Sequence, residues 1–500
     1  MSKKTLIEQQ ERLLPMFRDI CRLGQAEEEP VNEDQFLKRF LPIRSHFRVL
    51  DSDVRIIIGD KGSGKTHLFR ALEIQRGREA LVSLAREKGL PTPPLEKTTW
   101  LVGYHTTGKD FPPGGVIGAF ARGKDTSVLQ NFWLSLLVEV LLRAAKISAS
   151  SLPPRLREVI ASHTWDLEAL NEQVIAGLGD LFRVLDSLDT ELKAQDQYIF
   201  VSYDELDRVS PGDWEALRTI LQGLVQFWAA YGRRWRYIRP KIFLRRDLYQ
   251  RVALFGPDIA KIASNRADLL WGIHEFYGVL FKRLLNESDF YEYLSPARIQ
   301  LSENDALGKI PLASREEDYK LAINRMFGEY MGTDPRKGLT LRWIPNHLKD
   351  GHGQIYPRPL LRLLEDAAEI ELRDRKAKGT VRLLHHTALR GALDRVSEFR
   401  VQELAQEEFP WIETIRKNLE GKSLHVPGDR YGFTRAFKID WSQFKDRPPG
   451  TKPGAILDYL VELGIFSNRR DGRMDVGDLY LRGLHLKRKG GVARPKKIRG

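Results

Sequence analysis

Eight consecutive residues, Gly59-Asp60-Lys61-Gly62-Ser63-Gly64-Lys65-Thr66, fit the pattern G-x-x-x-x-G-K-[ST] at every fixed position. Glycines allow the backbone of such a loop to turn closely around phosphate oxygens and to aim its N–H groups at them. The lysine of this pattern reaches the β- and γ-phosphates, and the final hydroxyl is a ligand of Mg²⁺. The stretch therefore predicts a site for a nucleoside triphosphate and Mg²⁺, formed by Gly59, Asp60, Lys61, Gly62, Ser63, Gly64, Lys65, Thr66 and His67.

The residues on either side of this loop predict the elements that must position it. Residues 54–58 form a short β-branched run that is typical of a buried strand, and the apolar residues 68, 69, 71 and 72 recur at helical spacing. The positive end of that helix would face the phosphates. A glycine-rich turn that fits the pattern by chance would not need this strand and this helix.

A second strand, residues 198–203, ends in the carboxylates Asp204 and Glu205. Strands often end in acids, so the pattern is weak alone, but downstream of a phosphate-binding loop it predicts a metal-associated acid, Asp204, beside that loop. Glu205 is then placed to act as the general base that orients an attacking water. Asp207 either supports this site or caps the following turn, and we favour the cap.

Together, these motifs resemble the additional-strand P-loop ATPases, which include the AAA+ and STAND groups. That resemblance implies a polar or arginine sensor at the end of the strand next to residues 198–203, and Arg245 or Arg246 matches this place. It also implies an arginine finger that completes the site of a neighbouring subunit, for which Arg266 is the candidate. A surface pair of arginines is the alternative reading of residues 245 and 246.

The same resemblance implies a second sensor arginine at the start of a lid helix. Arg358 matches it, within Tyr356-Pro357-Arg358-Pro359-Leu360, and Arg362 is the competing candidate. Farther along, residues 455–463 predict an amphipathic helix, followed by a strand at residue 465, a turn at 470–473 and a returning strand at 479–481. A helix followed by a hairpin is typical of the end of a winged helix, a domain that binds DNA in some proteins and other proteins elsewhere.

The amino-acid composition predicts the kind of partner and the cellular location of the protein. The net charge is +13, from 80 basic and 67 acidic residues, and residues 485–500 hold seven basic residues and no acid. This balance favours nucleic acid as a partner, as do Arg469, Arg470 and Arg473 in the predicted hairpin, although a tail that is merely solvated is the alternative. A single cysteine, the lack of a signal peptide and the lack of a long apolar segment predict a cytoplasmic protein without a membrane partner.

The predicted fold class is α/β: a doubly wound parallel sheet of the P-loop NTPase type, with a helical lid and a winged-helix-like end. The 139 positions between Lys65 and Asp204 exceed what a compact core needs, which predicts a helical insertion at about 105–195. Within it, the leucines from 167 to 188 predict one amphipathic helix. The predicted regions are an N-terminal helical segment (1–45), the core (46–272), the lid (273–398), the winged-helix-like domain (399–484) and the basic tail (485–500).

We therefore expect an ATP-hydrolysing switch or motor that uses Mg²⁺. The motifs are similar to those of prokaryotic ATPases found in phage-defence and mobile-element clusters, which implies a role in defence with a separate effector protein. A DNA-loading or transposition-type ATPase that oligomerises on DNA is one alternative. A scaffold that binds ATP without hydrolysing it is another, although Glu205 would have no purpose there.

Overall fold

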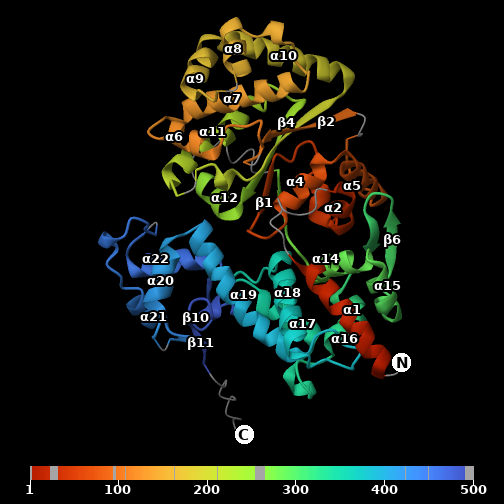
Figure 1. Ribbon diagram of the computed structural model, residues 1–500. Helices are drawn as coiled ribbons and strands as arrows, with labels where there is room; N and C mark the ends of the chain where they lie inside the picture. Colours follow the sequence, from red (N-terminus) through yellow and green to blue (C-terminus); the bar gives the residue numbers. More distant parts are fainter. Residues whose placement is uncertain are drawn as a thin grey trace, which may run out of the picture. The chain divides into compact units, whose positions relative to one another are not determined.

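The computed structural model describes residues 3–22, 32–93, 97–106, 108–162, 164–210, 212–253, 265–422, 424–448 and 450–489 (Figure 1). They form two compact units. The sheet unit comprises the described residues of 26–270 and 303–308, and the helical unit comprises those of 1–25, 271–302 and 309–500. In the described part of the chain, no helix is both long enough and apolar enough to cross a bilayer.

A five-stranded parallel sheet forms the centre of the sheet unit, with the strand order β2-β3-β4-β1-β5. The strands expected at residues 54–58 and 198–203 form β1 and β3, which lie inside the sheet where both faces are covered. β4 lies between β1, which leads into the glycine-rich loop, and β3, which ends at Asp204. This is the additional strand that the sequence motifs implied. The strands are β1 (Ile56–Gly59), β2 (Thr98–Tyr104), β3 (Tyr198–Tyr203), β4 (Ile238–Arg245) and β5 (Arg266–Asp268).

Helices cover both faces of the sheet. Alternate strand residues such as Ile58, Val201 and Leu244 join a large core with helices α7, α10 and α11. On the other face, Phe243 of β4 packs edge-on against Phe69 of α4, with ring centroids 5.7 Å apart. The fold is therefore the predicted doubly wound α/β type. The helices of this unit are α2 (Glu33–Arg39), α3 (Arg44–Arg48), α4 (Lys65–Glu73), α5 (Gln75–Glu87), α6 (Gly114–Ala121), α7 (Thr126–Arg143), α8 (Pro154–Ser162), α9 (Leu167–Ala176), α10 (Leu178–Gln195), α11 (Trp214–Tyr231) and α12 (Arg246–Ala253).

The segment between β2 and β3 consists of the helices α6 to α10, which lie together in Figure 1. The prediction of one helix across residues 167–188 was wrong, because the chain forms two helices that meet at Gly177. A Cβ atom at Gly177 would lie 2.8 Å from Cγ of Pro153, so a side chain there would collide with the preceding turn. The leucine spacing continues through the break because α9 and α10 bury their apolar faces in the same core.

The helical unit begins with α1, which packs on α18 and α14 although most of the chain separates them. Its helices up to residue 407 are α1 (Lys3–Cys21), α14 (Ile273–Leu285), α15 (Ser288–Leu294), α16 (Lys320–Phe327), α17 (Thr340–Leu348), α18 (Pro357–Asp374) and α19 (His386–Glu407). The paired strands β6 (Leu301–Asn304) and β7 (Gly308–Pro311) are shared between the two units, because residues 303–308 belong to the sheet unit. Pro357 opens α18, where a missing N–H costs nothing.

We call residues 411–488 the C-terminal module. It contains α20 (Trp411–Leu419), β8 (His425–Val426), α21 (Arg430–Ala436), α22 (Pro453–Glu462), β9 (Phe466–Asn468), β10 (Met474–Val476), α23 (Asp478–Leu481) and β11 (Lys487–Arg488). The predicted helix is α22, but the returning strand was placed wrongly. β10 returns at 474–476, antiparallel to β9, because the turn at 469–473 closes through a hydrogen bond from Arg469 N to Arg473 O, and residues 478–481 are helical.

Candidate nucleotide-binding site

The glycine-rich loop joins the end of β1 to the start of α4, as its motif requires. Gly62 and Gly64 have φ angles of 83° and 89°, which residues with a side chain rarely adopt, and Gly64 caps α4. A Cβ atom at Gly59 would lie only 2.2 Å from Oγ of Ser63, so the loop closes tightly on itself. The loop therefore has the compact turn and the helix N-terminus that phosphate groups require.

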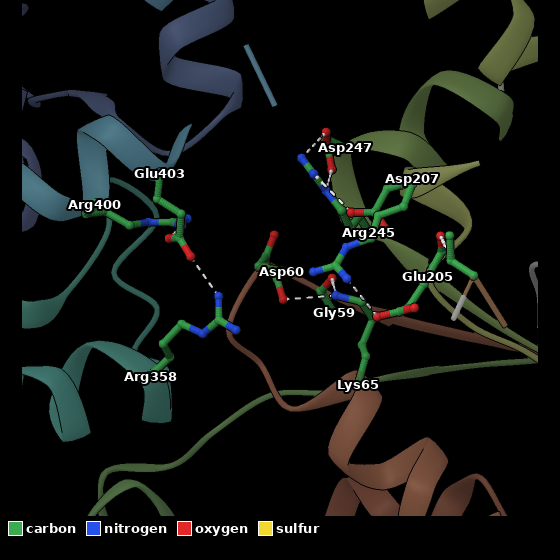
Figure 2. A network of polar contacts seen from close by, with 12 residues as sticks. Gly59, Asp60, Lys65, Glu205, Asp207, Arg245, Asp247, Arg358, Arg400 and Glu403 are labelled. Atoms are coloured by element: carbon green, nitrogen blue, oxygen red, sulfur yellow. Dashed lines mark hydrogen bonds and ion pairs between the residues drawn. The ribbon is translucent and has the colours of Figure 1, made fainter. Parts of the chain in front are cut away.

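Lys65, the first residue of α4, turns its side chain back across this loop. Its Nζ donates hydrogen bonds to the carbonyl oxygens of Gly59 (2.8 Å) and Asp60 (3.1 Å) (Figure 2). Burial lowers the pKa of Lys65, and the nearby carboxylates of Asp207 and Asp204 act in the opposite direction. The amine thus lies among the loop carbonyls and the acids that follow β3. Farther along α4, the ring of His67 stacks on Phe36 of α2.

Asp204 follows β3 and is buried, as a metal-associated acid at this edge would be. The hydroxyl of Thr66 donates a hydrogen bond to its carboxyl group, and burial raises the pKa of Asp204 to about 6. Its Oδ2 has no hydrogen-bond partner among the described residues. A buried carboxylate oxygen without a partner, next to a threonine hydroxyl, is a donor set that suits Mg²⁺. No described group of three or more His, Cys, Asp or Glu side chains could hold an ion by itself, so phosphate oxygens would have to complete this one.

Glu205, the predicted general base, is also buried and has a φ angle of 54°. This left-handed conformation is uncommon for a residue with a side chain, and such residues are enriched at functional sites. The Arg208 Nη1 donates to Oε1 of Glu205 at 3.1 Å, and Nε2 of His105 lies 3.5 Å from its Oε2. Thr106 donates to the backbone oxygen of Glu205 at 3.1 Å. Arg208 thus holds one carboxylate oxygen by a hydrogen bond, whereas His105 lies near the other without a hydrogen bond to it.

His105 is a site residue that our reading of the sequence missed. It directly follows β2, which lies next to β3 in the sheet, and its ring stacks on Phe69 at 5.5 Å. A polar residue immediately after a predicted strand was the available signal. That signal becomes meaningful only once β2 is known to pair with β3, because parallel neighbours end at the same edge.

Asp207 and Arg245 come together at the same edge. Nη1 of Arg245, at the end of β4, lies 3.4 Å from Oδ2 of Asp207, and its Nη2 donates to Asp247 at 2.9 Å (Figure 2). Although burial opposes the shift, Arg245 and Lys65 hold the pKa of Asp207 below its usual value. Our preference for Asp207 as a simple turn cap was therefore wrong, because its carboxylate takes part in the charge network around Lys65.

The second arginine of this pair points to the other side of the loop. Arg246 pairs with Asp60 and with Asp268 at the end of β5. Arg266, the candidate finger, donates from Nε to Asp268 at 3.0 Å and from Nη1 to the Tyr249 hydroxyl at 3.3 Å. Of the two arginines, Arg245 is thus the one that lies among the acids after β3, and its role as a sensor stays a prediction.

Arg358, the candidate lid sensor, belongs to the helical unit. Its Nη1 donates to Oε1 of Glu403 at 2.7 Å, and Nη1 of Arg400 donates to the other oxygen of that carboxylate at 2.7 Å (Figure 2). The competing candidate, Arg362, donates to Asp366 at 3.1 Å. The role of either residue at a nucleotide stays a prediction.

The charges of the C-terminal module are more balanced than its sequence suggested. In the hairpin turn, Arg469 pairs with Asp475 at 3.2 Å and Arg473 pairs with Asp471 at 2.6 Å. The exposed residues of α22 include both Asp458 and Glu462. Much of the positive charge that we assigned to the hairpin is therefore neutralised within it. Most of the predicted basic tail, residues 490–500, lies outside the described residues.

No protein-family model and no curated protein matches this chain. Among solved structures, it is similar to the ORC2 protein of Aeropyrum pernix in its ADPNP–ADP complexes, with 14% identity over 88% of this chain and 92% of that one, at a TM-score of 0.37. The Walker-type ATPase paby2304 of Pyrococcus abyssi gives 13% identity, coverage of 89% and 95%, and a TM-score of 0.32. Cdc6p from Pyrobaculum aerophilum gives 14%, 93% and 96%, and 0.30. Likeness at this level does not define a shared family or a shared activity.

Proposed function

We propose that this protein binds ATP with Mg²⁺ at the C-terminal edge of its five-stranded sheet and hydrolyses it. The observation that carries the proposal is that three parallel strands, β1, β3 and β4, end together at that edge. They bring the loop with Lys65, the acids Asp204 and Glu205, and Arg245 to one place. Nucleotide holding alone would need the loop, but a buried glutamate held in a strained backbone conformation supports a chemical step.

In the proposed reaction, the loop and Lys65 hold the triphosphate. Glu205 orients a water molecule and accepts its proton while the water oxygen bonds to the γ-phosphorus. The bond between that phosphorus and the β–γ bridging oxygen breaks, and the products are ADP and inorganic phosphate. Arg245 and Lys65 neutralise charge that develops on the transferred group. Thr66 and Asp204 would hold the Mg²⁺, and this ion would neutralise negative charge on the phosphates.

The preference for ATP and the wider role rest on the resemblance found in the sequence. We propose a cytoplasmic switch or motor in which Arg358 senses the nucleotide, and Arg266 serves a neighbouring subunit if the chain oligomerises. The order of α20 to β10 supports a winged-helix-like module. The sequence resemblance alone supports an anti-phage defence role with a separate effector, or a DNA-loading role.

Nucleic acid is the proposed ligand of the C-terminal module. Because the hairpin arginines pair within the hairpin, the proposal now rests on the basic tail and on α21 and the residues that follow it. There Tyr431, Arg435 and Lys438 recur at i, i+4 and i+7 and are all exposed. An exposed aromatic ring followed by two exposed cations suits base stacking and phosphate contact.

The experiment that tests the proposed activity is phosphate release from ATP by the wild type, by Glu205→Gln and by a control, Glu215→Gln, whose side chain is exposed on α11. We expect turnover in the wild type and the control, and a loss of about a hundredfold or more in Glu205→Gln with ATP binding retained. ATP bound without turnover in any of the three would favour the scaffold alternative. Repeating the assay with duplex and single-stranded DNA tests the partner, since turnover indifferent to both would contradict coupling to DNA.

A further inference from the structure

The glycine-rich loop contains an acid at its first variable position. Asp60 follows Gly59 directly, and its backbone oxygen accepts hydrogen bonds from Lys65 Nζ and from Ser63 N, both at 3.1 Å. Its backbone therefore belongs to the turn that would surround the phosphates. A carboxylate so close to a triphosphate would repel it, and the repulsion would be considerable in the low dielectric of a partly buried site. A site built for phosphate needs a way to cancel this charge.

Arg246 is placed to cancel it. This residue begins α12 directly after β4, and its Nε donates to Oδ2 of Asp60 at 3.1 Å. From the same guanidinium, Nη1 donates to Oδ1 of Asp268 at 2.9 Å. Although burial opposes the shift, the carboxylates of Asp60 and Asp268 raise the pKa of Arg246. The arginine is thus held from both sides and remains charged.

Asp268 ties this contact to the edge of the sheet. It is the last residue of β5, which pairs in parallel with β1 so that Ile58 lies opposite Asp268. Its second oxygen, Oδ2, accepts from Nε of Arg266 at 3.0 Å. Acids and bases therefore alternate from the loop to the edge strand, in the order Asp60, Arg246, Asp268, Arg266. Because Arg266 also neutralises Asp268, part of the positive charge of Arg246 remains to neutralise Asp60.

We propose that Arg246 is a positioning residue for nucleotide binding: it neutralises Asp60 and fixes the first turn of the glycine-rich loop in the form that accepts a triphosphate. The inference rests on the proposed function but adds a residue that never touches the phosphates. It separates the roles of two adjacent arginines. Arg245 lies among the acids after β3, whereas Arg246 acts through Asp60.

The geometry also explains why arginine rather than lysine stands at this position. A guanidinium presents donors in several directions from one rigid plane, so one side chain can reach Asp60 and Asp268 at once. A lysine amine is a single point that lies beside one carboxylate or between the two. We therefore expect Arg246→Lys to keep part of the effect.

The test is the affinity for ATP·Mg²⁺ in four proteins: the wild type, Arg246→Ala, Asp60→Asn, and the double variant. Arg246→Ala removes the arginine charge next to Asp60, so we expect the Kd to rise by about tenfold or more. In the double variant the repulsive charge is gone, and the Kd should return to within about threefold of the wild type. The loss in the single variant should shrink at high salt, since it is electrostatic.

A matched control is Arg234→Ala, because Arg234 also forms an ion pair, with Asp186, elsewhere in the sheet unit. It should bind ATP as the wild type does. Thermal unfolding of every variant separates loss of fold from loss of affinity, and in steady-state turnover Arg246→Ala should raise KM while leaving kcat within about twofold.

Two results would overturn the inference. One is an Arg246→Ala protein that binds ATP as tightly as the wild type. The other is a double variant that binds as weakly as the single one, since charge neutralisation would then not be the cause. A failure of the proposed function gives a different pattern, in which the wild type and Lys65→Ala show the same absence of ATP binding.

Discussion

Glu205, the proposed general base, has an energetically unfavourable backbone conformation. Its backbone has a φ angle of 54°, a conformation that costs about 1 kcal/mol or more for a residue with a side chain. The chain holds it there because Asp204 N bonds to Tyr104 O, Arg208 N bonds to Glu205 O and Arg208 holds the carboxylate. The conformation turns the chain directly after Asp204, so two adjacent acids serve one site from different directions.

This strain predicts a difference between two substitutions that both remove the carboxylate. Glu205→Gly and Glu205→Ala lose the same contacts to Arg208 and His105, but only glycine adopts the left-handed conformation without cost. We expect the glycine variant to be more stable than the alanine variant by about 1 kcal/mol, measured by denaturant unfolding, with hydrolysis lost in both. Equal stabilities would show that the backbone at this position is not strained.

At the scale of elements, β4 carries one positive charge at its C-terminal end and another in its middle. Arg245 lies at its C-terminal end, while Lys241 is fully buried in its middle. Nζ of Lys241 donates to the carbonyl oxygens of Asp51 (2.5 Å) and Val54 (2.7 Å), in the turn that precedes β1. Through Lys241, β4 thus holds the turn that precedes β1, and through Arg245 it contributes to the site at the C-terminal edge of the sheet.

Burial lowers the pKa of Lys241 to about 7, so the stability of the protein should depend on pH through this group. Between about pH 7 and pH 10.5 the unfolded chain carries a proton on this lysine that the folded chain lacks, so stability rises with pH there. Below pH 7 the lysine is protonated in both states, so the free-energy cost of burying its charge no longer changes with pH.

The measurement is the free energy of unfolding of the wild type minus that of Lys241→Met, as a function of pH. We expect this difference to shift in favour of the wild type by up to about 1.4 kcal/mol per pH unit across the window. Lys193→Met, which removes an exposed lysine of α10, is the control and should show a flat difference. A flat difference for Lys241→Met as well would contradict the prediction.

At the scale of the molecule, the order of segments in the sequence differs from their grouping in space. Helix α1 precedes the sheet unit along the chain but packs on α18 and α14 of the helical unit. Its Phe17 is fully buried, with ring centroids 6.1 Å from Phe290 and 6.0 Å from Phe327. The helical unit is therefore closed by a segment that lies far from the rest of it in sequence.

This packing predicts that α1 is a structural part of the helical unit rather than an appendage. Phe17→Ala should lower the free energy of unfolding by about 3–5 kcal/mol, because it leaves a cavity among buried rings. Glu8→Ala, at an exposed position of α1, should change it by less than about 0.5 kcal/mol. If Phe17→Ala costs as little as the control, α1 does not contribute to that core.

Much of the sheet unit followed from the sequence alone. The loop motif, the strand at 198–203 with its two acids, and the doubly wound fold class depend on short-range patterns, because a phosphate-binding turn needs glycines at fixed spacing and a buried strand needs a continuous apolar run. The pair Arg245 and Arg246 could also be placed at the end of a strand, but the sequence did not choose between them. By contrast, the sequence did not show which neighbour each charged side chain selects. His105 entered the site only through the pairing of β2 with β3, Asp207 and Arg246 took their partners from other strands, and the hairpin arginines proved to be neutralised by nearby aspartates. The pattern of residues specifies elements because it reflects local geometry, whereas ion pairs join residues far apart in sequence, and only the tertiary structure decides which of them meet.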